Sequence, residues 1–329
     1  MQRSTFIKSC LVLACTTLLN AAHAETQTSN SLGSSQFNVI APFVAGGPVD
    51  ILARILANGL TEKYKQSAVV ENRPGASGNI GIDIVKRAKP DGHTLLVVPQ
   101  GNLTINPTLM PTLSYKVFED LIPVSSIAKA ANVIAVHPSV KATNIQQLVA
   151  LSKSKPNSIS YASPGVGSSL HLAGELFKQK TGADILHVAY KGSGPGLTDA
   201  LGGNIPMIIA NMPTVLPHIH TGKLRALALT DGARSEFLPN VPILSESGVD
   251  GITVSSWYGV LAPKNTPPEI VKQLAEDVES ILKSPAVQSQ LKQQGMNEWV
   301  VKGDAFSEVI RKETALWSPI IKSYGIQAQ

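Results

Sequence analysis

Short apolar runs typical of strands alternate with segments of helical periodicity along nearly the whole chain, and this alternation constrains the fold more than any other feature. The run at 37–41, for example, precedes a segment with Ile51, Leu52 and Ile55 on one helical face. The pattern predicts an α/β fold with mainly parallel sheets. Further strands are predicted at 68–70, 94–98, 133–136, 159–161, 185–189, 205–209, 226–230 and 257–261. A helix is predicted at 79–87, and after residue 261 the pattern is helical to the end.

Length and charge narrow the class of protein. At about 150 residues per domain, 329 residues suggest two domains. Twenty-eight Lys and Arg against 23 Asp and Glu leave a charge of +5, but these residues are mixed along the sequence and form no basic block. We therefore expect no nucleic-acid partner.

The N-terminus has the features of a secretory signal peptide. Arg3 and Lys8 precede an apolar stretch at 11–19, and Ala-His-Ala follows at 22–24. We predict that residues 1–24 are cleaved and that the mature chain is periplasmic. A permanent anchor is the weaker alternative, because the apolar stretch is about half as long as a membrane-spanning helix. A lipid anchor at Cys15 is also weaker, since apolar residues continue beyond it.

Cleavage would remove both cysteines, Cys10 and Cys15. The mature chain of 305 residues would then hold no thiol, disulfide or cysteine-ligated metal, and we expect neither a metal site nor a cofactor. Residues 25–36 are rich in Ser, Thr, Asn and Gln, with Leu32 as the one large apolar side chain. This composition predicts a disordered lead-in.

Motifs of nucleotide binding are absent from the sequence. No G-x-x-x-x-G-K-[ST] loop occurs, and the glycines at 46–47 have no lysine placed to reach a phosphate. The stretch at 191–196 matches half of a dinucleotide fingerprint, but Thr198 stands where the third glycine would be. We therefore predict no nucleotide site.

An exported serine hydrolase or esterase is the alternative from another class of protein. Its candidate nucleophile, Ser168, lies in Gly-Val-Gly-Ser-Ser at 165–169, which does not match the G-x-S-x-G elbow. His171 is near in sequence, but no third group is evident to orient its imidazole, and triads are assembled from distant segments. We therefore expect no enzyme activity.

One kind of junction recurs along the chain: a strand ends, a Gly/Ser/Pro loop follows and a helix begins. In open α/β sheets such junctions lie at the carboxyl ends of the strands, where ligands bind. At 42–50, Pro48 suits the first helical position, and we expect Asp50 in the first turn to cap the helix. Gly46 and Gly47 carry no side chain, so a small anion has access to the backbone amides.

The second junction, at 161–171, combines hydroxyls with bare amides. Ser168 or Ser169 is predicted to cap a helix that runs to Thr181 and stops at Gly182. Two glycines and three serines within nine residues exceed what a cap requires, which favours ligand contact. A third junction at 190–199 offers Lys191 as a cation, and the loops at 100–102 and 211–214 supply neutral donors or form ordinary turns.

Seven motifs in this order resemble the Bug family of extracytoplasmic solute receptors, the binding components associated with tripartite tricarboxylate transporters. The resemblance covers essentially the whole chain from residue 37. The motifs are P-F-x-x-G-G-P-x-D at 42–50, E-N-R-P-G-A-x-G-x-x-G at 71–81, P-D-G-x-T-L at 90–95, Y-x-S-x-G-x-G-S-x-x-H at 161–171, Y-K-G-x-x-P at 190–195, G-K-L-R-A-L-A-x-T at 222–230 and W-Y-G-x-x-A-P at 257–263.

The resemblance implies a periplasmic-binding-protein fold of type II, with two α/β lobes, an interlobe cleft and two crossover strands. We place the crossings near 129–132 and 255–258, so that lobe 1 comprises 37–130 plus 258–329 and lobe 2 comprises 131–257. The resemblance also implies that ligand carboxylates are held by backbone amides, hydroxyls and water from the loops at 43–47 and 163–169. The candidate ligand-binding residues are Phe43, Ala45, Gly46, Gly47, Gln100, Asn102, Ser163, Gly165, Gly167, Ser168, Ser169, His171, Tyr190, Asn211 and Pro213.

The sequence departs from the family pattern where an acidic residue is common. Pro206 and Ala210 stand at positions that often carry Asp. If residue 210 faces the cleft, its replacement removes a partner for a ligand ammonium group, and we therefore hypothesise a carboxylate ligand without an amino group.

The expected function is capture of a small carboxylate in the interlobe cleft, followed by uptake through a permease of the tripartite tricarboxylate type. We expect a monomer that works with membrane permease subunits. A sensory ligand-binding module without transport stays open as an alternative, because the same cleft would serve both roles.

Overall fold

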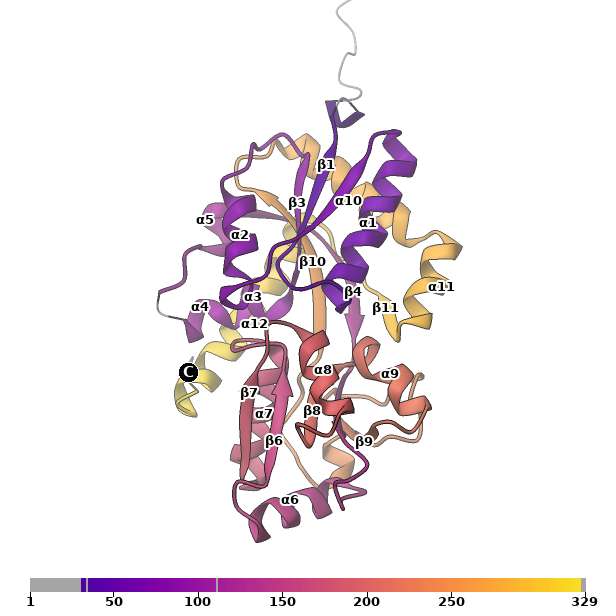
Figure 1. The fold of residues 1–329 in the computed structure, drawn as a ribbon. Coiled ribbons are helices and arrows are strands. Elements are labelled where there is room, and N and C mark those ends of the chain that lie inside the picture. Colours follow the sequence, from indigo (N-terminus) through magenta and orange to yellow (C-terminus); the bar gives the residue numbers. More distant parts are fainter. Residues whose placement is uncertain (1–30, 34, 111, 327–329) are drawn as a thin grey trace, which may run out of the picture.

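The computed structural model describes residues 31–33, 35–110 and 112–326. The predicted signal peptide at 1–24 lies outside these residues, as do residues 25–30 of the predicted lead-in. Two separate β-sheets with flanking helices organise the described chain (Figure 1). The prediction of an α/β fold is therefore confirmed.

The first sheet holds six strands in the order β11-β4-β10-β3-β1-β2. Its strands are β1 (Phe37–Ala41), β2 (Ala68–Asn72), β3 (Thr94–Pro99), β4 (Leu121–Ala130), β10 (Ser256–Pro263) and β11 (Met296–Glu298). The helices that accompany it are α1 (Pro48–Tyr64), α2 (Asn79–Lys86), α3 (Gln100–Thr104), α4 (Asn106–Leu109), α5 (Val117–Asp120), α10 (Pro268–Leu282), α11 (Pro285–Gln293) and α12 (Gly303–Ser323).

The second sheet holds five strands in the order β7-β6-β8-β5-β9. Its strands are β5 (Asn132–Val136), β6 (Ile159–Ser163), β7 (Ile185–Ala189), β8 (Met207–Asn211) and β9 (Arg225–Leu229). Its helices are α6 (Ile145–Ser154), α7 (Ser169–Thr181), α8 (Ser193–Leu201) and α9 (Met212–His220). Three short 3₁₀ turns complete the described chain: Ser31–Gly33, Ala76–Gly78 and Ser245–Ser247.

The chain passes from one sheet to the other at two places. Ala131 alone separates β4 of the first sheet from β5 of the second, and the return runs through 251–255 into β10. At both passages, strand ends of one sheet face strand ends of the other, so that the two sheets lie end to end (Figure 1).

The prediction of mainly parallel sheets is wrong. β1, β2 and β3 are parallel to one another, as are β6, β7 and β8, but β10 runs antiparallel to β3 and β4, and β5 runs antiparallel to β8 and β9. β10 and β5 are the strands by which the chain enters each sheet from the other. Such a strand starts at the edge where the helix-connected strands end, and it must therefore run in the opposite direction.

Two strands have no counterpart in the sequence prediction. β4 is broken as an apolar run by Pro123, Ser125 and Ser126, and β11 has only three residues within a region predicted to be helical. β8 starts two residues later than predicted, because Pro206 precedes the ladder instead of joining it.

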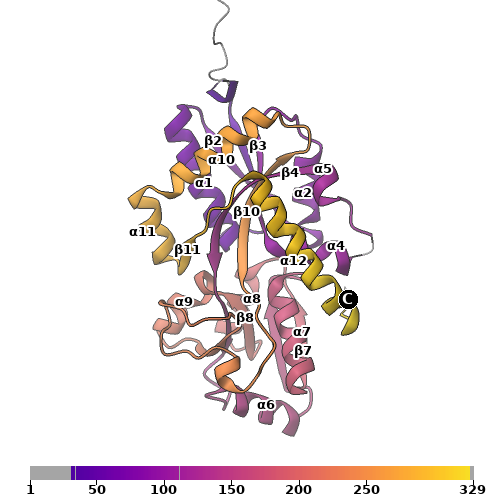
Figure 2. The same ribbon diagram turned by 180° about the vertical axis from the view of Figure 1, so that it is seen from behind.

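Apolar clusters cover both faces of each sheet, and α12 joins the two halves of the molecule. Phe306 and Ile310 belong to a cluster on the first sheet, whereas Trp317 and Ile321 belong to the cluster around α7 of the second. Figure 2 shows α12 running from the first sheet down to α7.

The predicted disordered lead-in is wrong in part. Ser31–Gly33 forms a 3₁₀ turn, and Leu32 is buried in the core beside α1 and α10. The one large apolar side chain of the segment therefore anchors its end, because burying it removes apolar surface from water. No helix of the described ranges is long and apolar enough to span a bilayer.

Candidate ligand-binding site

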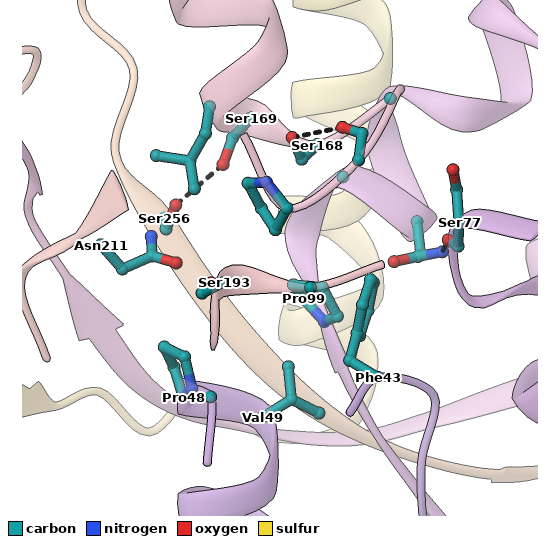
Figure 3. Close-up of a pocket in the computed structure, with 18 of the residues that line it drawn as sticks. Phe43, Pro48, Val49, Ser77, Pro99, Ser168, Ser169, Ser193, Asn211 and Ser256 are labelled. Carbon is teal, nitrogen blue, oxygen red and sulfur yellow. Dashed lines mark hydrogen bonds between the residues drawn. The ribbon is translucent and has the colours of Figure 1, made fainter. Parts of the chain in front are cut away.

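A pocket lies between the two sheets, with an empty volume of about 610 Å³ that is partly open to solvent. Residues of both sheets face one another across it, as Figure 3 shows for Val49 and Phe43 below and Ser168 and Ser169 above. The first sheet and its loops contribute Phe43, Val44, Gly47, Pro48, Val49, Ser77, Pro99, Gly101, Asn102, Asn106, Ser256 and Tyr258. The second contributes Pro164, Gly165, Val166, Gly167, Ser168, Ser169, Leu170, Gly192, Ser193 and Asn211.

None of the described residues that line this pocket has a charged side chain. An anion in it would be held by neutral donors, and a ligand ammonium group would find no carboxylate. Ala210 is buried inside the second sheet and does not line the pocket. The hypothesis of a ligand without an amino group is therefore supported by the lining as a whole and not by the residue at position 210.

The four-residue helix α4 begins at the pocket wall with Asn106, and three helices of nine residues or more also begin there. They are α1 at Pro48, α7 at Ser169 and α8 at Ser193, and each of these first residues lines the pocket. The first backbone N–H groups of a helix have no intrahelical acceptor, and they form the positive end of its dipole. α1 belongs to one sheet and α7 and α8 to the other, so helix N-termini from both halves border the same space.

Ser168 caps α7 as predicted. Its Oγ accepts a hydrogen bond from the backbone N–H of His171 at 3.1 Å and donates to the carbonyl of Gly165 at 2.7 Å. α7 ends at Thr181, and Gly182 follows in the left-handed conformation with φ 63°, which is also as predicted.

The serine–histidine pair of the hydrolase alternative is not assembled. The hydrogen of the Ser168 hydroxyl is directed to a carbonyl, and the ring of His171 accepts from the backbone N–H of Gly167 at 3.4 Å. Burial lowers the pKa of His171 to about 4, so the imidazole is neutral at pH 7. Nothing in this geometry activates Ser168 as a nucleophile.

Two more serine hydroxyls of the pocket are committed to a buried chain of hydrogen bonds. Ser256 Oγ donates to Asn132 Oδ1 at 2.8 Å, which leaves the hydrogen of Ser169 to bridge the 2.8 Å between the two serine oxygens (Figure 3). Asn211 Nδ2 donates to the same Asn132 oxygen at 2.8 Å. The chain therefore links three lining residues to the first crossing between the sheets.

Asp50 lies in the first turn of α1 but binds the loop before the helix, where it occupies an amide that was predicted to meet the ligand. Its carboxylate accepts from the N–H of Gly46 at 3.0 Å, from Asn72 Nδ2 at 3.1 Å and from Arg54 Nε at 3.1 Å. Desolvation would raise its pKa, but the hydrogen bonds from Arg54, Gly46 and Asn72 outweigh this and lower it.

Eight of the predicted ligand-binding residues line the pocket: Phe43, Gly47, Asn102, Gly165, Gly167, Ser168, Ser169 and Asn211. Seven do not: Ala45, Gly46, Gln100, Ser163, His171, Tyr190 and Pro213. Six of the seven lie in the same segments as the eight, and Tyr190 lies in the junction at 190–199, of which Gly192 and Ser193 line the pocket.

The polar side chains among these seven have partners elsewhere. Gln100 Nε2 donates to Glu313 at 2.5 Å, Ser163 Oγ lies 2.6 Å from His187 Nε2, and the Tyr190 hydroxyl donates to Asp199 at 2.7 Å. His171 borders a separate cavity with Glu175 and His187 instead of the cleft. Tyr190 lines a neighbouring pocket that shares Phe43, Ser77 and Gly165 with the main one.

The loop that carries Ser77 was missed by the sequence analysis. Four consecutive residues have positive φ: Gly75 at 134°, Ala76 at 46°, Ser77 at 53° and Gly78 at 97°. Asn102 Nδ2 donates to the carbonyl of Ser77 at 2.8 Å and holds the loop against the pocket. Such a conformation is strained for Ala and Ser and persists only where surrounding contacts fix it.

Other missed lining residues include Pro48 and Val49, Ser193, and Ser256 and Tyr258. The first three stand inside junctions that the sequence analysis had singled out, so the helix-start argument applied to them as well. Tyr258 lies in the W-Y-G-x-x-A-P motif, which carried no chemical signal by itself. Within the described ranges, no group of three His, Cys, Asp or Glu side chains is placed to hold a metal ion.

Comparison with known proteins places this geometry in a family. The family model described as the tripartite tricarboxylate transporter family receptor matches residues 52–326. The protein BugT of Bordetella pertussis is 37% identical over 309 residues, which cover 94% of this chain and 95% of BugT.

Solved structures agree with the architecture. The periplasmic binding protein BugD has a TM-score of 0.85 at 30% identity, covering 90% of this chain and 99% of BugD. Rpa4515 of R. palustris, solved with adipate, has a TM-score of 0.86 at 34% identity, covering 89% of this chain and 98% of that one. The chain belongs to the family of tripartite tricarboxylate transporter receptors that includes the Bug proteins, and it has their periplasmic-binding-protein fold of two α/β lobes.

Proposed function

We propose that this protein captures a small carboxylate without an amino group in the cleft between its two sheets, and delivers it to a membrane permease of the tripartite tricarboxylate type. One observation carries the proposal: the helices α1, α7 and α8 begin at a pocket whose described lining has no charged side chain. Such a site attracts a carboxylate through amides and dipoles, and offers no counter-charge to an ammonium group.

Binding is coupled to closure of the two lobes, which we propose to be 37–130 plus 258–329 and 131–257. The ligand meets amides of α1 on one lobe and of α7 and α8 on the other, so it favours the conformation in which these lie close together. A hydrogen bond to a charged group contributes roughly 1.5–3 kcal/mol. Four or five such bonds offset the entropy of immobilising ligand and lobes and give a micromolar Kd, or about −8 kcal/mol.

The proposal has support from a relative. Rpa4515, which resembles this chain along nearly its whole length, was solved with the dicarboxylate adipate. The proposed location is periplasmic, after cleavage of residues 1–24, and the proposed working form is a monomer that contacts permease subunits. A pull-down of membrane proteins with the mature chain tests this last step.

Calorimetry on the mature protein tests the ligand class. We expect adipate and other plain dicarboxylates to bind with a micromolar Kd, and the amino-acid counterparts glutamate and aspartate to bind at least tenfold more weakly. Micromolar binding of the amino acids, with none of the plain dicarboxylates, would overturn the proposal.

A further inference from the structure

Two buried polar atoms of the pocket lining have no partner within the described part of the chain, Asn106 Oδ1 and the Tyr258 hydroxyl, and of these only the hydroxyl can donate a hydrogen bond. The hydroxyl oxygen of Tyr258 is buried and makes no hydrogen bond within the described part of the chain. The residue is 1% exposed and lines the pocket. An unpaired buried hydroxyl costs free energy, because it has lost its hydrogen bonds to water.

Other tyrosine hydroxyls of this protein have hydrogen-bond partners within it. The Tyr115 hydroxyl, also buried, donates to the carbonyl of Asn102 at 2.6 Å. The Tyr161 hydroxyl donates to Glu175 at 3.1 Å, and the Tyr190 hydroxyl donates to Asp199 at 2.7 Å. Tyr258 departs from this pattern at the place where a ligand is expected.

The position of Tyr258 explains how it can serve a ligand. It stands in β10, opposite Pro99 at the carboxyl end of β3, and Pro99 also lines the pocket. Its ring packs in the same apolar cluster as Val49, in the first turn of α1. Tyr258 therefore borders the cleft from a strand by which the chain crosses between the lobes.

Three of the five serine hydroxyls in the pocket lining are not equivalent alternatives. Those of Ser168, Ser169 and Ser256 donate to Gly165, Ser256 and Asn132 within the protein. Burial raises the pKa of Tyr258, so its hydroxyl keeps its proton and can only act as a neutral group.

Resting on the proposed function, we infer that Tyr258 is a ligand-binding residue whose hydroxyl donates a hydrogen bond to an oxygen atom of the bound carboxylate. The ligand oxygen is the acceptor that the hydroxyl lacks within the described part of the chain. Because the donor lies on the crossing strand β10, the bond forms only with a ligand whose oxygen atom reaches this strand. The bond thereby contributes to specificity.

The test compares Tyr258→Phe with wild type, using calorimetry with adipate, malate and straight-chain mono- and dicarboxylates of four to eight carbons as probes. The tightest-binding probe should bind Tyr258→Phe about tenfold more weakly, since one hydrogen bond to a charged group is lost. The melting temperature of the ligand-free variant should stay the same or rise, because the substitution removes an unpaired buried hydroxyl.

Tyr161→Phe is the matched control, because its hydroxyl is paired and lies outside the pocket. It should lower the melting temperature and leave the affinity unchanged. If wild type binds a probe and Tyr258→Phe binds it equally well, the inference is overturned while the proposed function stands. If no carboxylate of the panel binds wild type, the proposed function fails, and this inference with it.

Discussion

At the scale of single residues, three of the six side-chain hydroxyls that line the cleft donate within the protein and are structural. Ser168 is the clearest case, since its oxygen both accepts from the His171 N–H and donates to Gly165. The same sequence feature therefore supports a cap and argues against a nucleophile. What remains for the ligand is backbone amide and the few side chains whose hydrogens are not engaged.

Ser168→Ala should lower the free energy of unfolding by about 1 kcal/mol, because α7 loses its N-cap. Urea unfolding measures this loss, with the exposed Ser154→Ala at the end of α6 as a control that should change little.

The same variant tests for enzyme activity. Wild type and Ser168→Ala should not differ in their turnover of p-nitrophenyl acetate. Ser168-dependent turnover would revive the hydrolase alternative.

At the scale of elements, a glycine in α3 allows the close approach of the two halves of the molecule beside the cleft. A Cβ atom at Gly101 would lie 2.5 Å from the carbonyl oxygen of Gly167 and 3.2 Å from Ser168 Cα. Both belong to the loop before α7 on the opposite lobe. The short α3 helix itself accepts alanine, so the obstacle lies between the lobes and not within one of them.

Gly101→Ala should therefore weaken binding of adipate by about ten- to a hundredfold, which corresponds to the roughly 1–3 kcal/mol of an overpacked contact. Calorimetry measures the affinity, and small-angle scattering should show a smaller compaction on addition of ligand than in wild type. Gly59→Ala is the control: its Cβ would meet Ile281 at 2.5 Å inside one lobe, so it should lower stability without changing closure. Wild-type affinity in Gly101→Ala would contradict this account.

At the scale of the whole molecule, the two lobes are joined where Asp231 meets both crossings. Its carboxylate accepts from the N–H of Asn132 at 2.8 Å and from the side chain of Ser255. Desolvation raises its pKa to about 6, against the opposing effects of these hydrogen bonds and of the Lys129 charge. Helix α12 adds a further connection, since its two ends pack on different sheets.

The pH dependence follows from the sign of this shift. Between about pH 4 and pH 6 the unfolded chain loses the Asp231 proton before the folded protein does, so this group lowers stability as the pH rises through that window. Asp231→Asn should raise the free energy of unfolding by about 1–2 kcal/mol at pH 7, and by much less at pH 4. Urea unfolding of wild type and variant at both pH values checks this, and an equal difference at the two would refute it.

The α/β class, most strand positions and the helix starts could be predicted from the sequence, because hydrophobic period, Pro48 and the Ser168 cap are local properties of the chain. The sequence also pointed to the segments that build the cleft. It did not determine the direction of β5 and β10, which depends on the passage of the chain between two sheets.

Which residues of those segments line the pocket depends on contacts between distant parts of the chain. Gly46 and Gly47 are neighbours in one loop, yet the Gly46 amide is bound by Asp50 and Gly47 lines the pocket. Tyr258 gave no chemical signal in sequence, and its hydroxyl became informative only once burial had removed it from water and no partner stood nearby. Local pattern fixes where a helix begins, but the accounting of hydrogen bonds requires every distant neighbour to be in place.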